Sequence, residues 1–178
     1  MYPYLRLAWH LMLARREAPL KIEETGVMHT RVYFGDIDFF SELNNGRYLT
    51  LMDLGRMHLA ARTGLMGVAH RKGWGFFVAG ASVRFRHRLP LFTKIELSTR
   101  VLGRDERWFY FHQVYSWKGK PCFSGLVRAG VKNEKGIVPV HEVMDALGRP
   151  EWNPELPSWV LAWSSADLEL PWPPEGFD

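Results

Sequence analysis

Residues 34–49 read Phe-Gly-Asp-Ile-Asp-Phe-Phe-Ser-Glu-Leu-Asn-Asn-Gly-Arg-Tyr-Leu, and no other stretch of the chain is as informative. Two carboxylates follow a β-like run that ends at Phe34, and an amide pair opens a helical pattern that extends from Asn45 to Thr63. A carboxylate thus faces the first turn of a helix, where free backbone N–H groups and the positive end of the helix dipole gather. This arrangement suits attack on a carbonyl group, because the amides hold the developing oxyanion and the carboxylate supplies a base or nucleophile.

The same stretch resembles the signature of the hotdog-fold thioesterases, in particular the 4-hydroxybenzoyl-CoA thioesterase family and its acyl-CoA thioesterase-like branch. The signature contains Asp-x-Asp, a loop that often ends in His-Val/Met-Asn-Asn, a Tyr-Leu pair, and an acidic residue before Arg. The matching positions are Asp36, Asp38, Leu43, Asn44, Asn45, Tyr48, Leu49, Asp53 and Arg56. Glu42 stands where many relatives have His, so the role of that His does not carry over. The pair Phe39-Phe40 stands where small residues are common, which predicts a narrower pocket.

The resemblance implies a role for each residue around the predicted helix start. Asp38 would lie beside the thioester carbonyl and act as nucleophile or as base for a water, and the Asn45 backbone N–H would hold the oxyanion. Asn44 would cap the helix or hold the loop, Gly46 would leave space near the thioester, and Asp36 is expected to be structural. From the residues alone, Asp38 can also be a turn-forming residue after a strand, and Asn45 can be part of an ordinary helix cap.

The resemblance also indicates where the rest of a substrate would bind. The acyl chain is expected in an apolar tunnel beside the central helix, near Tyr48 and Met52. The phosphates of coenzyme A would meet arginines, whose fork geometry suits phosphate oxygens. The arginine candidates are Arg84, Arg86, Arg88, Arg104 and Arg107. Each of them taken singly is equally compatible with a solvated strand residue.

The sequence is compatible with more than one role for two further carboxylates, Glu42 and Asp53. Glu42 is either a second acid/base group or a solvent-facing side chain. Asp53 and Arg56 are three residues apart on the predicted helix, so their spacing predicts a surface ion pair that contributes little to stability. Asp53 also lies near the position of a helix carboxylate in another thioesterase branch, which makes it a second catalytic candidate.

The rest of the chain predicts an α+β domain. Four segments alternate apolar and polar residues with the period of a strand, at residues 76–86, 94–102, 107–117 and 122–132. Turn residues separate the last three segments, which therefore form an antiparallel meander. A helix followed by a run of strands favours a helix lying on one sheet face. The resemblance specifies this as the hotdog fold, a curved antiparallel sheet wrapped around a long central helix.

Appendages flank this domain. Residues 1–20 are expected to hold an N-terminal amphipathic helix, residues 21–148 the thioesterase-like domain, and residues 149–178 a C-terminal appendage rich in Trp and Pro. The appendage includes a predicted helix from Ser158 to Leu168. Because its Trp and Leu side chains need burial, we expect it to pack on the body or across a dimer.

Charge and cysteine content restrict the compartment and the ligands. All 23 Lys and Arg lie within residues 1–150, whereas residues 151–178 hold six of the 19 acidic residues. A basic body suits an anionic ligand such as a CoA phosphate, an acidic membrane or a nucleic acid; the alternative is solvated surface charge with the acidic tail folded back on it. Cys122 is the sole cysteine, which excludes an intrachain disulfide and fits a reducing compartment. A cytoplasmic location is therefore expected, with membrane association as an alternative.

Other function classes find little support. The seven His residues show no metal-ligand spacing, and the sequence has no Gly-x-Ser-x-Gly, phosphate-loop or dinucleotide motif, so no metal or cofactor is expected. The aromatic segment 107–117 suits core packing better than base stacking, and no nucleic-acid partner is expected. No apolar run is long enough to span a bilayer, but residues 1–17 suit peripheral membrane contact or packing on the body or a partner subunit.

The expected activity is hydrolysis of an acyl-CoA or acyl carrier protein thioester, and the resemblance implies a homodimer or dimer of dimers. The alternative is a non-catalytic acyl-thioester or lipid-binding hotdog protein. A hotdog dehydratase is disfavoured, because its His/Asp pairing is not visible in the sequence.

Overall fold

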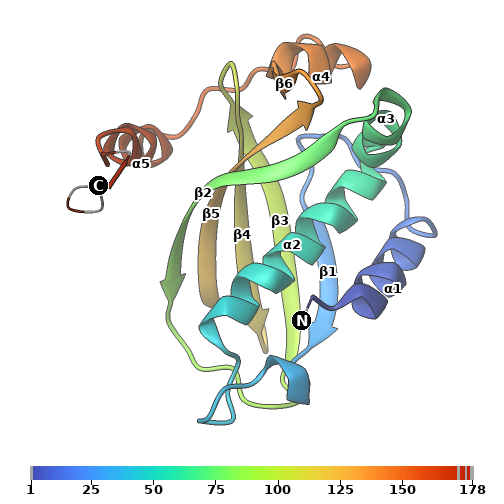
Figure 1. The fold of residues 1–178 in the computed structure, drawn as a ribbon. Helices are drawn as coiled ribbons and strands as arrows, with labels where there is room; N and C mark the ends of the chain where they lie inside the picture. The colour runs from blue at the N-terminus through green and yellow to red at the C-terminus, as the bar shows by residue number, and fades with distance from the viewer. Residues whose placement is uncertain (1, 172, 175, 177–178) are drawn as a thin grey trace.

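A computed structural model describes residues 2–171, 173–174 and 176 of the chain. A six-stranded antiparallel sheet curls around one long helix (Figure 1). The strands are β1 (Gly26–Arg31), β2 (Gly75–Phe85), β3 (Lys94–Arg104), β4 (Phe109–Trp117), β5 (Lys120–Asn133) and β6 (Gly136–Val138). Their order is β1-β3-β4-β5-β2, and β6 pairs with the end of β5. The α+β architecture and the β3-β4-β5 meander are as predicted, and the sheet wraps its central helix as the hotdog fold requires.

The central helix α2 (Asn45–Arg62) begins where the sequence predicts. Asn44 is its N-cap, and the side-chain oxygen of Asn44 accepts a hydrogen bond of 2.9 Å from the backbone N–H of Gly46. Leu43 and Tyr48 are both buried on either side of this cap, as a hydrophobic staple requires. The helix stops before Gly64, which has the left-handed φ of 80° that favours glycine. Local sequence therefore accounts for both ends of α2.

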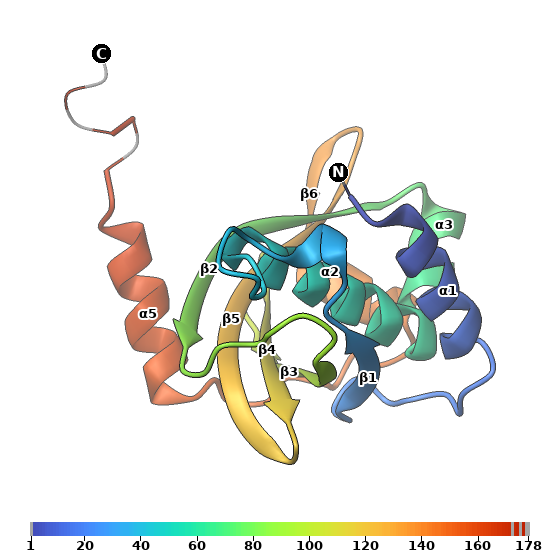
Figure 2. The same ribbon diagram turned by 90° about the horizontal axis from the view of Figure 1, so that it is seen from below.

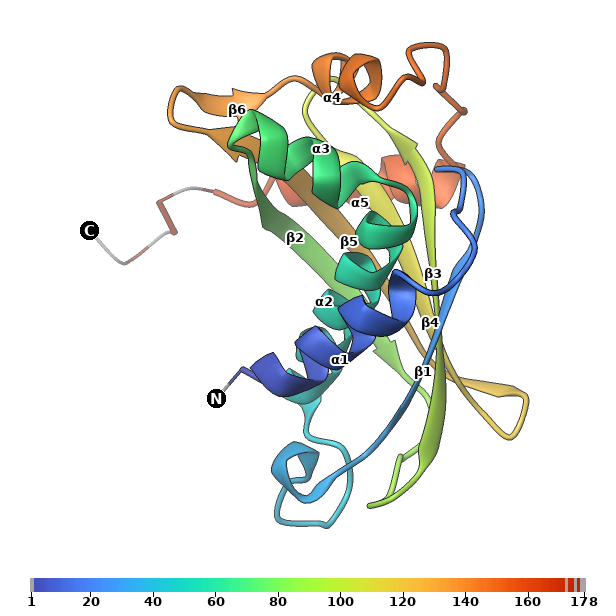
Figure 3. The same ribbon diagram turned by 90° about the vertical axis from the view of Figure 1, so that its right-hand side faces the viewer.

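Four shorter helices surround this unit: α1 (Tyr4–Ala14), α3 (Leu65–Lys72), α4 (Val140–Ala146) and α5 (Ser158–Leu168). Helix α1 lies beside α2, whereas α5 lies across the opposite face of the sheet (Figure 2). The side view shows the sheet between α2 and α5 (Figure 3). Among the described residues, none of the helices has the length and apolar composition needed to cross a membrane.

The structure differs from the prediction at three places. The first strand ends at Arg31, because the chain bends and residues 34–36 form a 3₁₀ turn in which the Asp36 carboxylate accepts a hydrogen bond of 3.0 Å from the Tyr33 N–H. Helix α3 was not predicted; it restarts directly after Gly64 and ends at Gly73, also left-handed with φ 66°. Strand β6 is too short to show a period in the sequence.

Candidate functional site

The two carboxylates of Asp-x-Asp occupy different environments. Asp36 is fully buried, and its oxygens accept hydrogen bonds from Arg6 at 2.8 Å and from Arg47 at 2.9 Å. A buried carboxylate is stable only when it is paired in this way. Asp36 therefore ties α1 and α2 to the loop that follows β1, in agreement with its expected structural role.

A cleft of about 160 Å³ lies at the N-terminal end of α2. Its walls include Glu42, Asn45, Tyr48, Phe85 and Arg86. The backbone N–H of Asn45 is at the first helical position and donates no hydrogen bond to any other described residue. A free N–H at a helix start is a ready donor for a negatively charged oxygen. This end of α2 thus offers an anion-stabilising group inside a cleft.

Glu42 is the carboxylate on the wall of this cleft. The carbonyl oxygen of Glu42 accepts the Asp38 N–H at 2.9 Å, and the next N–H, of Leu43, donates to the Leu89 carbonyl at 2.9 Å. These bonds fix the backbone on which the side chain stands. The carboxylate lies 3.3 Å from the Nε of Arg88, whose side chain is largely exposed. Glu42 is partly buried and lines the cleft, which leaves an acid/base role open to it.

Asp38 lies in the same loop, but it is not one of the residues that line the cleft. Its Oδ1 accepts a hydrogen bond of 2.8 Å from the Phe40 N–H, whereas Oδ2 accepts none from the described residues. Burial, and to a smaller extent Cys122 and the carboxylates of Glu42 and Asp38, raise the pKa of Tyr48 to about 12. Asp38 is therefore close enough to act electrostatically on Tyr48 in the cleft wall. Its Oδ2 has no hydrogen-bond donor among the described residues.

The arginine candidates divide into two groups. Arg86 and Arg88 line the cleft, and Arg84 is exposed nearby on β2. Arg104 lies at the opposite end of the sheet, since β3 runs eleven residues from Lys94, roughly 30 Å. The Nε of Arg104 donates to the Trp152 carbonyl at 2.9 Å, and Arg107 lies beyond it in the turn before β4. The structure of the single chain does not bring Arg104 and Arg107 to the cleft.

The expected surface pair of Asp53 and Arg56 is wrong. Arg56 is buried; it donates to the Asp53 carboxylate at 3.2 Å and to the Gln113 side-chain oxygen at 2.8 Å. Gln113 is also fully buried and donates to Thr99 at 2.9 Å, while the Tyr2 hydroxyl donates to Asp53. The spacing of the pair along the helix was correct, but the sheet covers this helix face, which spacing cannot reveal.

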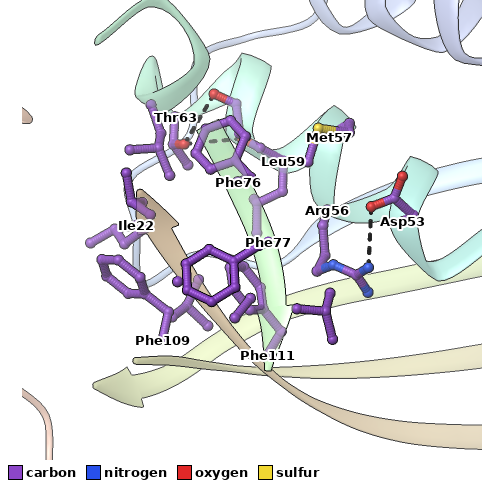
Figure 4. A pocket seen from close by; sticks show the side chains of 17 residues that line it. Ile22, Asp53, Arg56, Met57, Leu59, Thr63, Phe76, Phe77, Phe109 and Phe111 are labelled. Atoms are coloured by element: carbon purple, nitrogen blue, oxygen red, sulfur yellow. Dashed lines mark hydrogen bonds and ion pairs between the residues drawn. The ribbon is translucent and has the colours of Figure 1, made fainter. Parts of the chain in front are cut away.

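An apolar cavity of about 360 Å³ lies further along α2, between its C-terminal half and strands β2, β4 and β5. Aromatic side chains point into it from the strands, and the Asp53–Arg56 pair lies at one end (Figure 4). Helix α2 packs mainly on β1 and β3 within the sheet, which leaves room beside β2. The aromatic walls are Phe76, Phe77, Phe109 and Phe111. These residues were not recognised from the sequence as site residues; the alternation of β2 and β4 indicated only that some of them face inward.

The residues expected around the acyl chain do not line this cavity. Tyr48 lines the cleft instead, and Met52 is fully buried and fills the space that a side chain at Gly125 would need. Asn44 and Gly46 are exposed beside the cleft. Cys122 is a buried thiol on β5. None of the described residues form a group of three or more His, Cys, Asp or Glu that could hold a metal ion.

Comparison with known proteins identifies the family. A family model described as the thioesterase-like superfamily matches residues 32–164. Protein THEM6 of Xenopus laevis is 32% identical over 128 residues, which are 72% of this chain and 61% of that protein. Protein THEM6 of Drosophila melanogaster is 28% identical over 153 residues, 84% of this chain and 77% of the relative. The chain thus spans about three fifths of the length of the Xenopus relative.

Solved structures show the same fold. BH1999 gentisyl-coenzyme A thioesterase superposes with a TM-score of 0.62 at 22% identity, over 67% of this chain and 99% of the other. The probable thioesterase YbaW of Escherichia coli gives 0.63 at 15% identity, over 69% and 96%. Both the fold and the family expected from residues 34–49 are confirmed, and the chain belongs to the thioesterase-like superfamily.

Proposed function

We propose that the protein is an acyl-CoA thioesterase, which hydrolyses the thioester of a fatty or aromatic acyl-CoA. The observation that carries the proposal is that Asn45, whose backbone N–H donates to no other described residue, lines a cleft whose wall also includes Glu42. Thioester hydrolysis needs this combination of an oxyanion donor and a base or nucleophile. An acyl carrier protein thioester presents the same carbonyl and is the other carrier that the site would accept.

Asp38 supplies the base or the nucleophile in this proposal. As a base, its free oxygen takes a proton from a water that attacks the carbonyl carbon, and the CoA thiolate leaves and is protonated. As a nucleophile, it forms an acyl anhydride with release of the thiolate, and water then cleaves the anhydride. In both routes the Asn45 N–H stabilises the oxyanion, and Arg84, Arg86 and Arg88 attract the phosphates.

The second candidate is a non-catalytic protein that binds acyl thioesters. The observation that favours it is the Asp38 side chain, which is engaged in a turn with the Phe40 N–H and does not line the cleft. In such a protein Asp38 would stabilise the loop alone.

Hydrolysis of a panel of acyl-CoA thioesters separates the two candidates. We expect the wild-type protein to release CoA from at least one of them, and Asp38→Asn to lower kcat/KM at least roughly a hundredfold, because a general base contributes that much or more. Glu42→Gln, measured beside it, removes the carboxylate of the cleft wall. Unchanged activity in Asp38→Asn would remove that residue from the mechanism, and tight binding without turnover by the wild type would establish the non-catalytic candidate.

Peripheral membrane contact through residues 1–17 is the proposal for the N-terminal helix, in a protein otherwise expected in the cytoplasm. Tyr4, Leu5 and Trp9 leave large apolar surfaces exposed on α1, with Leu5 90% exposed. Aromatic and apolar side chains of this kind insert at a lipid interface. We expect the protein to sediment with anionic phospholipid vesicles and Leu5→Glu with Trp9→Glu to abolish this. Equal sedimentation of both proteins would exclude α1 as the contact.

A further inference from the structure

Two loops next to the cleft leave large aromatic side chains in solvent. They are residues 33–42, between β1 and α2, and residues 86–93, between β2 and β3, and they lie together at the bottom of Figure 1. Phe39 and Phe40 are 95% and 73% exposed, and neither lines the cleft. These two side chains therefore do not narrow the cleft, and an apolar surface of this size indicates contact with another molecule.

A second aromatic pair joins the two loops. The rings of Phe34 and Phe92 lie 5.3 Å apart, edge to face, and both side chains are exposed. Backbone hydrogen bonds also join the loops, from the Leu91 N–H to the Ser41 carbonyl at 3.2 Å and from the Phe92 N–H to the Val32 carbonyl at 2.9 Å. These bonds fix the backbone that carries the aromatic rings.

The backbone of both loops is strained. Ser41 and Phe92 have the left-handed φ values of 59° and 65°, which residues with a side chain seldom adopt, and bulky ones least of all. Such a conformation costs free energy, persists only where the surrounding structure enforces it, and is concentrated at functional sites. The fold therefore maintains the exposed rings in a defined arrangement.

The same end of the sheet is strongly basic. Residues 84–94 hold four Lys or Arg and no Asp or Glu, and Arg31 on β1 pairs in register with Lys94 on β3. The three acidic residues of loop 33–42 are buried or partly buried. The exposed rings are thus bordered by exposed cations, which are Arg84, Arg86, Arg88 and Lys94.

Charge selects the partner of this surface. A second copy of the chain docked here about a twofold axis would bring the same arginines against each other, because such an interface uses one patch on both copies. A bilayer with anionic headgroups matches both features of the surface. It attracts Lys and Arg, and its interface accepts aromatic rings.

We propose that these two loops insert their aromatic rings into the interface of an anionic lipid bilayer, while the neighbouring cations contact the headgroup phosphates. This surface is separate from the exposed residues of α1, and the proposal does not depend on thioesterase activity. Glu42, Arg86 and Arg88 belong both to the loops and to the cleft wall, so the docked protein holds its cleft beside the bilayer.

Sedimentation with lipid vesicles tests the proposal. We expect the wild type to bind vesicles of phosphatidylcholine and phosphatidylserine, and Phe39→Ser with Phe40→Ser to lower this binding by about tenfold or more, because burial of a single Phe is worth about that factor. Lys94→Glu should weaken binding through its charge. Leu168→Ser with Leu170→Ser is the matched control, since these side chains are 76% and 73% exposed elsewhere on the surface. All these variants should keep the wild-type Tm, because the replaced side chains are exposed.

A fluorophore at residue 39 locates the contact directly. Phe39→Cys labelled with the environment-sensitive dye NBD should brighten when the vesicles are added, whereas Leu168→Cys with the same label should not. The native Cys122 is buried on β5, so labelling is selective. Unchanged emission at residue 39 would overturn the proposal even if the vesicles still bind through α1, which Leu5→Glu with Trp9→Glu tests separately.

Two further outcomes would also overturn it. Equal vesicle binding by the wild type and by Phe39→Ser with Phe40→Ser would show that the rings do not enter the bilayer. If light scattering found that double variant to be monomeric where the wild type is dimeric, with vesicle binding unchanged, this face would be an interface between copies of the chain.

Discussion

At the scale of single residues, Asp36 and Asp38 lie two positions apart and occupy different environments. Asp36 turns inward, where Arg6 and Arg47 neutralise it and its exposed fraction is zero. Asp38 is partly buried, and its Oδ2 accepts no hydrogen bond from the described residues. The 3₁₀ turn at residues 34–36 separates them, since it breaks the alternation that would have placed both on one face.

Substitution of these two residues should separate stability from activity. Asp36→Asn leaves the charges of Arg6 and Arg47 without their buried counter-charge, so we expect a loss of about 3 kcal/mol in the free energy of unfolding. For a chain of this size the corresponding decrease in Tm is roughly 6 to 12 °C. Thermal unfolding followed by circular dichroism measures it, with Asp38→Asn as the control that keeps its Tm. Equal Tm values for the two variants would contradict the structural role of Asp36.

At the scale of elements, α1 is attached to α2 by polar contacts as well as by packing. The Glu17 carboxylate, just after α1, lies 2.8 Å from Arg62 and 3.4 Å from His58 on α2. His10 is buried on the inner side of α1. Burial, then the nearby His58 and Arg6, lower the pKa of His10 to about 4, although Glu17 opposes them. Burial lowers the pKa of His58 as well.

These histidines predict a loss of stability in acid. Burial favours the neutral form of both in the folded protein, and their unfolded pKa is about 6.5, so the unfolded state binds more protons as the pH falls below that value. The contribution of these histidines to the free energy of unfolding is therefore fully present above pH 6.5. It decreases as the pH falls toward about 4, the pKa of His10 in the folded protein. We expect the Tm of His10→Leu to decrease less over this range than the wild-type Tm. His29→Leu is the control, because the imidazole of His29 is exposed on β1. If the Tm of all three proteins depended on pH in the same way, His10 would be excluded as a cause of the acid sensitivity.

A buried cation is one of the contacts that hold helix α5 on the sheet. Arg128 on β5 contacts the faces of Trp108 and Trp163 and pairs with Asp167 on α5. Trp163 lies against Gly80, where a larger residue would displace it. The sheet face opposite α2 is therefore covered by the chain's own C-terminal segment, with buried Val160 of α5 beneath it.

At the scale of the whole molecule, β2 presents an open sheet edge. It pairs with β5 on one side, and none of its eleven residues is buried. Unprotected edges of this length invite pairing with another strand. We propose that two copies pair through β2 and form a homodimer.

Light scattering after size exclusion tests this pairing. We expect the wild type to have twice the 20.7 kDa mass of the chain, and the double variant Val78→Lys with Ala81→Lys to be monomeric, because lysine on an edge strand opposes edge pairing. Both positions are exposed in one protomer, so folding should be retained. Leu161→Lys on exposed α5 serves as control. A double variant that stays dimeric would place the interface elsewhere.

Features that depend on near neighbours could be predicted from the sequence. The Asn44 cap, the staple of Leu43 and Tyr48 and the glycine after the helix specify α2, and the period of two specifies the meander, because each signal lies within one turn or one strand. The signature at residues 34–49 then identified the family.

Which of these residues meet could not be predicted, because it depends on the packing of the whole domain. Arg6 reaches Asp36 across thirty residues of sequence, Gln113 turns the pair Asp53–Arg56 into a buried network, and Arg104 ends far from the cleft. The position of the cavity beside β2 depends on how far α2 stands from each strand. Such contacts follow from sheet order, register and helix placement, which are set by packing over the whole core, and local periodicity carries no information about them.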